Sequence, residues 1–312
     1  MSATTPAFSF QSLTESSGPY QRQQWLRWPR VFLALMLTLV LGSCSTARLG
    51  YNNADTLAYW WMDGYVDFNS TQKAKVKRDI AQLLSWHRSS QLPQYAQTLG
   101  QMQTVLAANP GPAEIEAVYR QVEQHLQVTL LKAVPELTDF VLSMDESQKA
   151  YLARKFEKNN EDFRDKYLDL TPEKQAKERR KKFLKQVDEW LGSVNREQEA
   201  LITRHLEKHP ANYAQWLEES MARQRLVMQL ITHIQTEKPS REAAQAMVQK
   251  LIMTSFETAD SAERRSQTEN SRMAMQTMLP NLLRLATPAQ KTHATQKLQN
   301  WIDDCKYLSA KK

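Results

Sequence analysis

The chain contains 312 residues, carries a net charge of +7, and 41% of its residues are hydrophobic. Only 7 residues are glycine, which is too few for the many tight turns of a β-sandwich or barrel of this length. Good helix formers such as Gln, Ala, Leu, Lys and Glu are abundant instead. We therefore predict an all-α protein, an irregular array of roughly ten amphipathic helices.

The first 43 residues have the features of an export signal. After a polar stretch, three arginines precede a largely apolar run of eleven residues, 31–41. A membrane-spanning helix needs about 20 apolar residues, so this run is typical of a signal-peptide core instead. It ends in Leu41-Gly42-Ser43-Cys44, which is similar to the lipobox of bacterial lipoproteins. We expect acylation of Cys44 and removal of a leader and signal peptide, residues 1–43. An ordinary secretory signal with an incidental cysteine is the alternative.

The expected anchor indicates where the protein lies. Acyl chains contribute about 0.8 kcal/mol per buried methylene, and more than one chain gives stable attachment. Ser45 follows the cysteine, where Asp tends to retain enteric lipoproteins at the inner membrane. We therefore predict a periplasm-facing protein of the outer membrane. Export excludes nucleic acid as a partner and leaves membrane surfaces and acidic proteins for this basic chain.

The mature chain is predicted to begin with an acylated cysteine and a polar tether, 44–53. A helical domain, 54–312, follows, and a subdivision near 109–112 is left open. The first helix carries four aromatic residues at helical spacing. Such a stripe is typical of a core, and rings at the membrane interface are the alternative. The resulting candidate contact surface comprises Tyr59, Trp60, Trp61 and Tyr65.

Apolar periodicity and proline positions predict the later helices. Asn109-Pro110-Gly111-Pro112 is the sharpest break. Breaks or kinks are expected at Pro210 and Pro280. Two of the later helices begin at Leu92 and near Leu137, and the others span about 70–89, 113–133, 146–168, 172–192, 196–208, 211–236, 240–258, 259–285 and 288–309.

A start signal recurs along the chain. An apolar or small residue is followed by Asn, Asp or Thr, then by two variable residues and Gln. This is the pattern of a capping box, in which each cap stabilises a helix by about 1 kcal/mol. The uneven spacing excludes a regular solenoid. The copies occupy residues 68–72, 144–148, 194–198 and 286–290, and a degenerate copy, 170–174, has Gln175 one place late.

Two residue pairs were weighed as catalytic or metal sites. His205 and His209 could share a helix face as zinc ligands do, but they do not match His-Glu-x-x-His and fit a role at a helix end. Asp63 and Asp67 could act as acid and base, but solvent exposure is the simpler interpretation. The sequence shows no phosphate loop, nucleophile elbow or Cys-x-x-Cys motif. We predict no enzyme activity, metal or cofactor.

The densest positive patch lies within residues 172–192. An apolar face makes this helix amphipathic, and acidic residues dilute its charge. A solvated helix face is the simplest interpretation, and contact with anionic lipid headgroups or an acidic partner is the alternative. The patch comprises Lys177, Arg179, Arg180, Lys181, Lys182 and Lys185.

Cys305 is left without a disulfide partner if Cys44 is acylated. It shares an apolar face with Leu298, Ile302 and Leu308, which predicts a buried structural thiol.

The lipobox is followed by Tyr51-Asn52-Asn53-Ala54 and by the segment 57–65, Leu-Ala-Tyr-Trp-Trp-Met-Asp-Gly-Tyr. This N-terminal part resembles a proteobacterial lipoprotein family of unknown function. The resemblance implies a helical lipoprotein and no site residues.

The start signals also resemble the Leu-Thr-x-x-Gln motif of small periplasmic stress chaperones, which are helical and bind unfolded clients. Only Leu170-Thr171 and Ala286-Thr287 retain the Thr, and the first lacks the Gln in register. We therefore predict a lipid-anchored envelope protein that acts by protein or membrane-surface contacts. A chaperone-like holdase with unfolded clients is one alternative, and a hydrolase or metal-dependent enzyme is the other.

Overall fold

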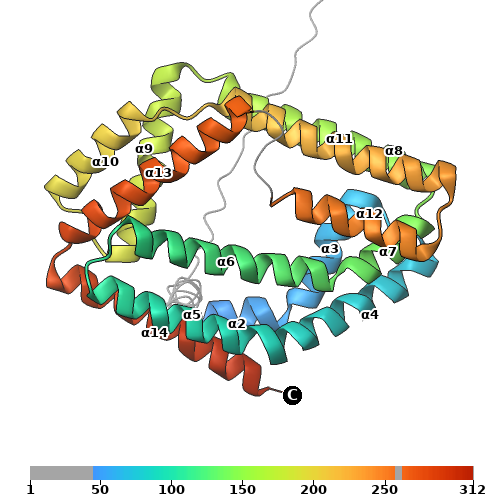
Figure 1. Ribbon diagram of the computed structural model, residues 1–312, viewed down its shortest axis with the longest axis horizontal. Helices are drawn as coiled ribbons and strands as arrows, with labels where there is room; N and C mark the ends of the chain where they lie inside the picture. Colours follow the sequence, from blue (N-terminus) through green and yellow to red (C-terminus); the bar gives the residue numbers. More distant parts are fainter. Residues whose placement is uncertain (1–44, 257–261, 312) are drawn as a thin grey trace, which may run out of the picture. The chain divides into compact units, whose positions relative to one another are not determined.

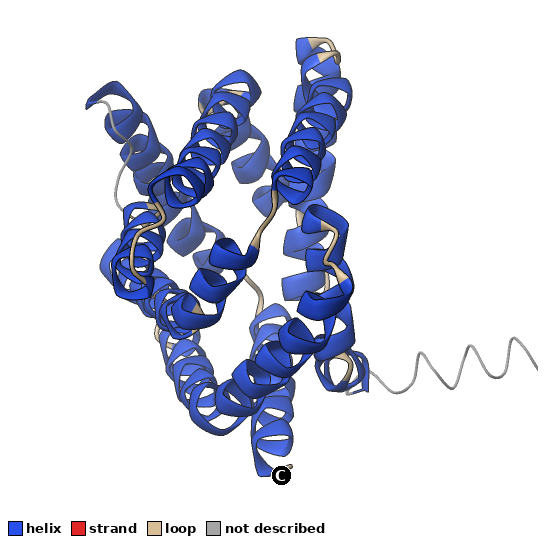
Figure 2. Ribbon diagram, turned by 90° about the vertical axis from the view of Figure 1, so that its right-hand side faces the viewer, coloured by secondary structure: helices blue, strands red, loops and turns tan. Residues whose placement is uncertain are grey.

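The computed structural model describes residues 45–256 and 262–311. Every regular element in these residues is a helix, as Figure 2 shows, which confirms the predicted all-α class. Within the same residues, no helix combines the length and the apolar character that crossing a membrane requires. The predicted signal segment and Cys44 lie outside the described residues. The described residues from Ala47 onward form one compact unit.

The helices follow the expected ranges closely, and α13 continues through Pro280, where a break was one expectation. Figure 1 labels most of them. In chain order they are α2 (Ser45–Asn52), α3 (Ala54–Val66), α4 (Ser70–Trp86), η1 (His87–Gln91), α5 (Leu92–Ala107), α6 (Pro112–Lys132), α7 (Val134–Ser143), α8 (Glu146–Phe163), η2 (Arg164–Leu168), α9 (Pro172–Leu191), α10 (Arg196–Lys208), α11 (Tyr213–Glu237), α12 (Arg241–Thr254), α13 (Ala262–Arg284) and α14 (Pro288–Ala310).

The segment expected to be a tether is helical. Within α2, Arg48 Nε donates to Asp304 Oδ1 of α14 at 2.5 Å, and Tyr51 Oη lies 2.8 Å from His87 Nδ1. Asp304 is buried, so this ion pair fixes α2 more firmly than an exposed pair would. The chain therefore joins the helical unit as soon as its described part begins.

The four start signals form the capping boxes that the sequence predicts, at Asn69, Asp145, Asn195 and Thr287. In each box the cap side chain accepts from the backbone N–H of the Gln, and the Gln Oε1 accepts from the backbone N–H of the cap. The degenerate fifth copy has a cap only: Thr171 Oγ1 accepts from Lys174 N.

The four glutamines of these boxes are buried and meet in two pairs, which we call the first and the second clasp. In the first clasp, Gln72 and Gln148 each donate an amide hydrogen to the other's Oε1, at 3.1 and 2.7 Å. In the second clasp, Gln198 and Gln290 do the same at 3.1 and 2.9 Å. Each clasp therefore joins the N-termini of two helices that are far apart in sequence, α4 with α8 and α10 with α14.

Each clasp lies beside its own hydrophobic core. The first core contains Phe68, which is 2% exposed. The centre of its ring lies 5.9 Å from that of Tyr59 and 5.1 Å from that of Phe140. The second core is aliphatic around the fully buried Ile202, with Leu191, Leu282, Ala294 and Leu298. Helices α5 and α14, distant in sequence, pack side by side next to this second core.

Candidate binding surface along α6

Helix α6 begins where the sequence predicts the sharpest break. Gly111 precedes Pro112 at the first turn, where the missing proline N–H costs little, and Gly111 N donates to Glu114 Oε2 at 3.0 Å. The helix lies against α13 and α5, as Figure 1 shows. It also contacts α12 and α7, so its 21 residues form a long helix with a stable first turn that several others adjoin.

Within the described residues, the neighbours of α6 leave its apolar face uncovered. All of its residues are described, yet none is buried, although the face carries a regular apolar stripe. Tyr119 is 51% exposed, and Val122 and Leu126 are each 53% exposed. An amphipathic helix normally buries such a stripe, so an uncovered stripe on a well-formed helix marks a candidate interaction surface.

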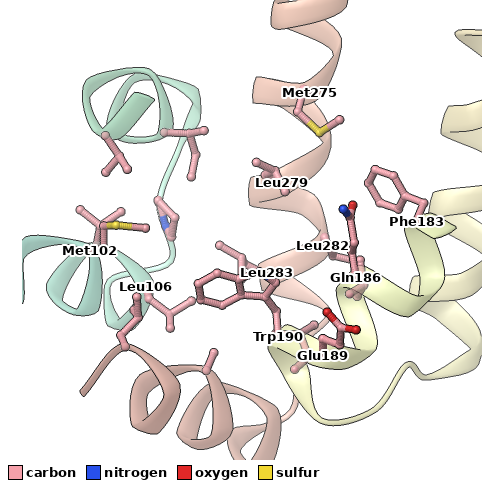
Figure 3. Close-up of a pocket in the computed structure, with 18 residues that line it drawn as sticks. Met102, Leu106, Phe183, Gln186, Glu189, Trp190, Met275, Leu279, Leu282 and Leu283 are labelled. Atoms are coloured by element: carbon pink, nitrogen blue, oxygen red, sulfur yellow. The ribbon is translucent and has the colours of Figure 1, made fainter. Parts of the chain in front are cut away.

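Two cavities adjoin this stripe. Figure 3 shows the first, with a volume of about 570 Å³, between α5, α6, α9, α13 and α14. Met102 and Leu106 of α5 line one side, and the Trp190 indole of α9 another; Leu279 comes from α13. The second cavity, of about 680 Å³, also contacts Met102. Ile115 and Val118 of α6 line the first cavity, whereas Val122 and Leu126 line the second.

We call the row Ile115, Val118, Val122 and Leu126, with the two cavities behind it, the α6 surface. Its lining is predominantly apolar, and Gln186 and Glu189 are the polar side chains at the first cavity. Trp190 packs edge-on against Trp301 at 5.1 Å, which fixes the indole between α9 and α14. This arrangement can bind apolar side chains or acyl groups.

The aromatic stripe of α3 divides into two parts. Tyr59 is buried in the first core, and Tyr65 Oη accepts from Asn159 Nδ2 at 3.0 Å. Trp60 and Trp61 are each 66% exposed. Of the four residues of the predicted surface, the two indoles are therefore the exposed ones, because the pitch of the helix turns Tyr59 towards the core.

Both candidate chemical pairs lie at the C-terminal ends of helices, α3 and α10. Asp63 Oδ1 accepts from Phe68 N at 2.9 Å, and Asp67 adopts a left-handed conformation, φ 50°, at the end of α3. The rings of His205 and His209 are 4.9 Å apart. Burial lowers the pKa of His205, and His209 and Arg179 lower it further. The described residues contain no group of three or more His, Cys, Asp or Glu arranged for a metal ion.

Several members of the predicted basic patch bind within the protein. Arg179 Nη1 donates to Leu206 O and His209 O at 3.3 and 2.5 Å, which caps the end of α10. Arg180 pairs with Glu199 at 2.5 Å, and Lys182 Nζ lies 4.8 Å from the centre of the Tyr167 ring. Part of this charge therefore joins α9 to its neighbours.

The apolar periodicity of the sequence predicts the helix at 113–133 but does not distinguish its apolar face from those of the other helices. The available signal was its position after the sharpest break, with several large apolar residues on one face. Exposure of that face depends on which helices pack against it, and periodicity alone carries no such information.

A profile described as a family of unknown function, DUF6279, matches residues 64–257. The match covers more than half of the chain. The protein belongs to this family. No curated protein and no solved structure matches the chain. The matched region includes α6 and the whole first clasp, but not Gln290 of the second clasp.

Proposed function

We propose that the protein is a non-enzymatic, lipid-anchored component of the bacterial envelope that acts through contacts with other proteins. The carrying observation is the α6 surface, which leaves Val122 and Leu126 more than half exposed beside two apolar cavities. Burying such side chains against a partner contributes about 25 cal/mol per Å² of apolar surface. The surface therefore supports binding of apolar segments of proteins.

Attachment at Cys44 would hold the chain, and with it the α6 surface, at the membrane. Trp60 and Trp61 are exposed on α3, within 20 residues of Cys44 in the sequence, and indoles favour the membrane interface. Radiolabelled palmitate, compared between the wild-type chain and Cys44→Ala, tests the anchor. We expect labelling of the wild type only, and equal labelling of both would contradict the anchor.

The contact function is tested by binding of a fluorescently labelled, unfolded polypeptide to the full mature chain, measured by anisotropy. Leu126→Gln places a polar group on the α6 surface and should weaken binding. Leu49→Gln is the matched control, because Leu49 is 62% exposed on α2 and lines neither cavity. Equal binding by the two variants and the wild type would reject the α6 surface.

A holdase is the second candidate, favoured by the length of the α6 surface. The stripe extends over three turns from Ile115 to Leu126, which suits an extended client segment better than a single side chain. The protein should then suppress aggregation of an unfolded client at near-stoichiometric ratio without ATP. If the protein binds the client but does not suppress its aggregation, the contact function stands and the holdase function is rejected.

A further inference from the structure

The second cavity has a polar wall that the proposed function does not use. Its volume of about 680 Å³ lies in the usual range for small-molecule pockets. Three helices that meet here, α5, α6 and α14, supply most of its apolar lining. The apolar part of the cavity consists mainly of Leu99, Met102, Val122, Leu126, Trp301 and Leu308.

Four side chains on this wall form one hydrogen-bonded row. Tyr51 Oη lies 2.8 Å from His87 Nδ1, and His87 Nε2 lies 3.1 Å from Tyr95 Oη. Tyr95 Oη lies 3.3 Å from Thr129 Oγ1, and Thr129 Oγ1 donates to His125 O at 2.9 Å. The row therefore connects α2, the short π-helix η1, α5 and α6 along one wall of the cavity.

Only one direction of donation suits every member of this row. The Thr129 hydroxyl donates its only hydrogen to the His125 carbonyl. The hydrogen bond between Thr129 and Tyr95 must therefore be donated by Tyr95. His87 Nε2–H then donates to Tyr95, and a neutral imidazole leaves Nδ1 to accept from Tyr51. Tyr51 begins the row, and no donor in the described part of the chain is hydrogen-bonded to its oxygen.

The wall carries no net charge at neutral pH. Burial lowers the pKa of His87 and of His125, and it raises the pKa of Tyr51 to about 12. Asp304, which also lines the cavity, is paired with Arg48 at 2.5 Å. Burial likewise raises the pKa of the Cys305 thiol. Among the described residues that line the cavity, an anionic headgroup would therefore find no unpaired cation. Arg88 lies over the Tyr51 ring, 5.2 Å from its centre, but does not line the cavity.

We propose that this cavity binds a neutral single-chain lipid, whose acyl chain lies among the apolar residues and whose hydroxyl group donates to Tyr51 Oη. An uncharged donor matches the acceptor at the start of the row. A fatty acid, whose carboxylate is a hydrogen-bond acceptor, does not match it. The site goes beyond the proposed protein contacts, because it requires the polar row and not the exposed stripe alone.

The test uses the full mature chain in amphipol with a monoacylglycerol that carries a diazirine in its acyl chain. Labelled protein is quantified by intact mass, and labelled peptides are located. We expect labelling within α5, α6 and α14, and weaker labelling at pH 7.5 by palmitic acid that carries the same diazirine. Equal labelling by the two probes, or labelling spread over the chain, would overturn the proposal.

Two variants and one control make the test specific. Leu126→Trp fills the cavity and should abolish labelling, whereas Tyr119→Trp adds the same group on α6 outside the cavity lining and should not. Tyr51→Phe should reduce labelling about fivefold, because it removes one neutral hydrogen bond to the lipid and so weakens binding by about that factor. If Leu126→Trp fails to fold by circular dichroism, Tyr51→Phe decides, and unchanged labelling of that variant contradicts the proposal.

Discussion

The two clasps have the same design, but their neighbouring cores differ. In the first clasp, Gln72 donates to the carbonyl of Ser143, two residues before the cap of the partner helix, and Gln148 donates to the carbonyl of Asp67, two residues before the cap Asn69. In the second clasp, Gln290 donates to Ser193 O in the equivalent way. The remaining bond, to Leu285 O, comes from Asn195 instead of Gln198.

This exchange of donors has a chemical reason. The cap of the box that contains Gln148 is Asp145, a carboxylate that cannot donate, so Gln148 supplies the hydrogen. The cap in the second clasp is Asn195, whose amide accepts from Gln198 N and donates to Leu285 O. Different donors thus satisfy the carbonyls at equivalent positions of the two clasps, Asp67 O and Leu285 O, as burial of a polar network requires.

The cores next to the clasps differ more. Aromatic rings fill the first core, and none of its residues lines either cavity of the α6 surface. The second core shares Leu106, Val187, Leu282 and Leu298 with the wall of the first cavity. The first core is therefore separate from both cavities, whereas residues of the second core also form part of the wall of the first cavity.

The largest expected effect comes from breaking a clasp. Gln148→Ala should lower the free energy of unfolding by about 4 kcal/mol and Gln198→Ala by about 3 kcal/mol, because each removes both hydrogen bonds between the buried carboxamides of a clasp, and Gln148→Ala also removes the donor to the carbonyls of Val66 and Asp67. Urea denaturation measures both. The exposed cap variant Ser240→Ala is the control, with an expected loss of about 1 kcal/mol. Equal losses in all three variants would show that the clasps are ordinary caps.

Substitutions at the C-caps of α3 and α9, Asp67 and Gly192, should change the free energy of unfolding in opposite directions. Gly192 has φ 73°, and a Cβ there would lie 2.9 Å from His293 Nδ1, so Gly192→Ala should cost about 2 kcal/mol. Asp67 has φ 50°, so Asp67→Gly should stabilise by up to about 1 kcal/mol. Thermal unfolding compares the two variants with the wild type. A loss of stability for Asp67→Gly would show that its carboxylate matters more than its backbone.

The second cavity should make the protein sensitive to acid. Burial lowers the pKa of His87 and His125, so below their ordinary value of 6.5 the unfolded chain binds protons that the folded chain does not. Stability should therefore fall as the pH drops from 7 to 5. Urea midpoints at both pH values, for the wild type and for His125→Gln, measure this effect. The urea midpoint of the variant should decrease less between pH 7 and pH 5 than that of the wild type. An equal decrease in both proteins would show that His125 does not contribute to the acid sensitivity.

The smallest expected effect on stability concerns the exposed indoles. Trp60→Ala should change the free energy of unfolding by less than about 0.5 kcal/mol, because the side chain is 66% exposed. Its neighbour Tyr59 is buried in the first core, and Tyr59→Ala should cost about 3 kcal/mol. Chemical denaturation of the two variants compares them directly. A large loss for Trp60→Ala would mean that this indole supports the fold.

The sequence predicts local structure well here because local chemistry determines it. The caps at Asn69, Asp145, Asn195 and Thr287 were predictable, since the two halves of a capping box lie three residues apart. Pairing of the box glutamines was not predicted, because a residue at N3 of one helix gives no information about the helix it meets. A serine two residues before two of the caps, Ser143 and Ser193, was a signal that the sequence contained.

The candidate site was harder to predict than the fold. Tyr59 and Trp60 are adjacent in one aromatic run, and only tertiary packing decides that one is buried and the other exposed. The row from Tyr51 to Thr129 joins residues of four separate elements, and Tyr51 was placed in a tether. Such convergence of distant polar groups follows from the arrangement of helices and leaves no local pattern.

Photo-crosslinking in intact cells tests the central claim most directly, that the α6 surface binds other proteins. Benzoylphenylalanine at Val122 points from the exposed apolar stripe, and the same group at Arg120 occupies an exposed polar position on the same helix. We expect crosslinked protein adducts from position 122 and few from position 120. Equal yields from both positions, or none from position 122, would contradict the account.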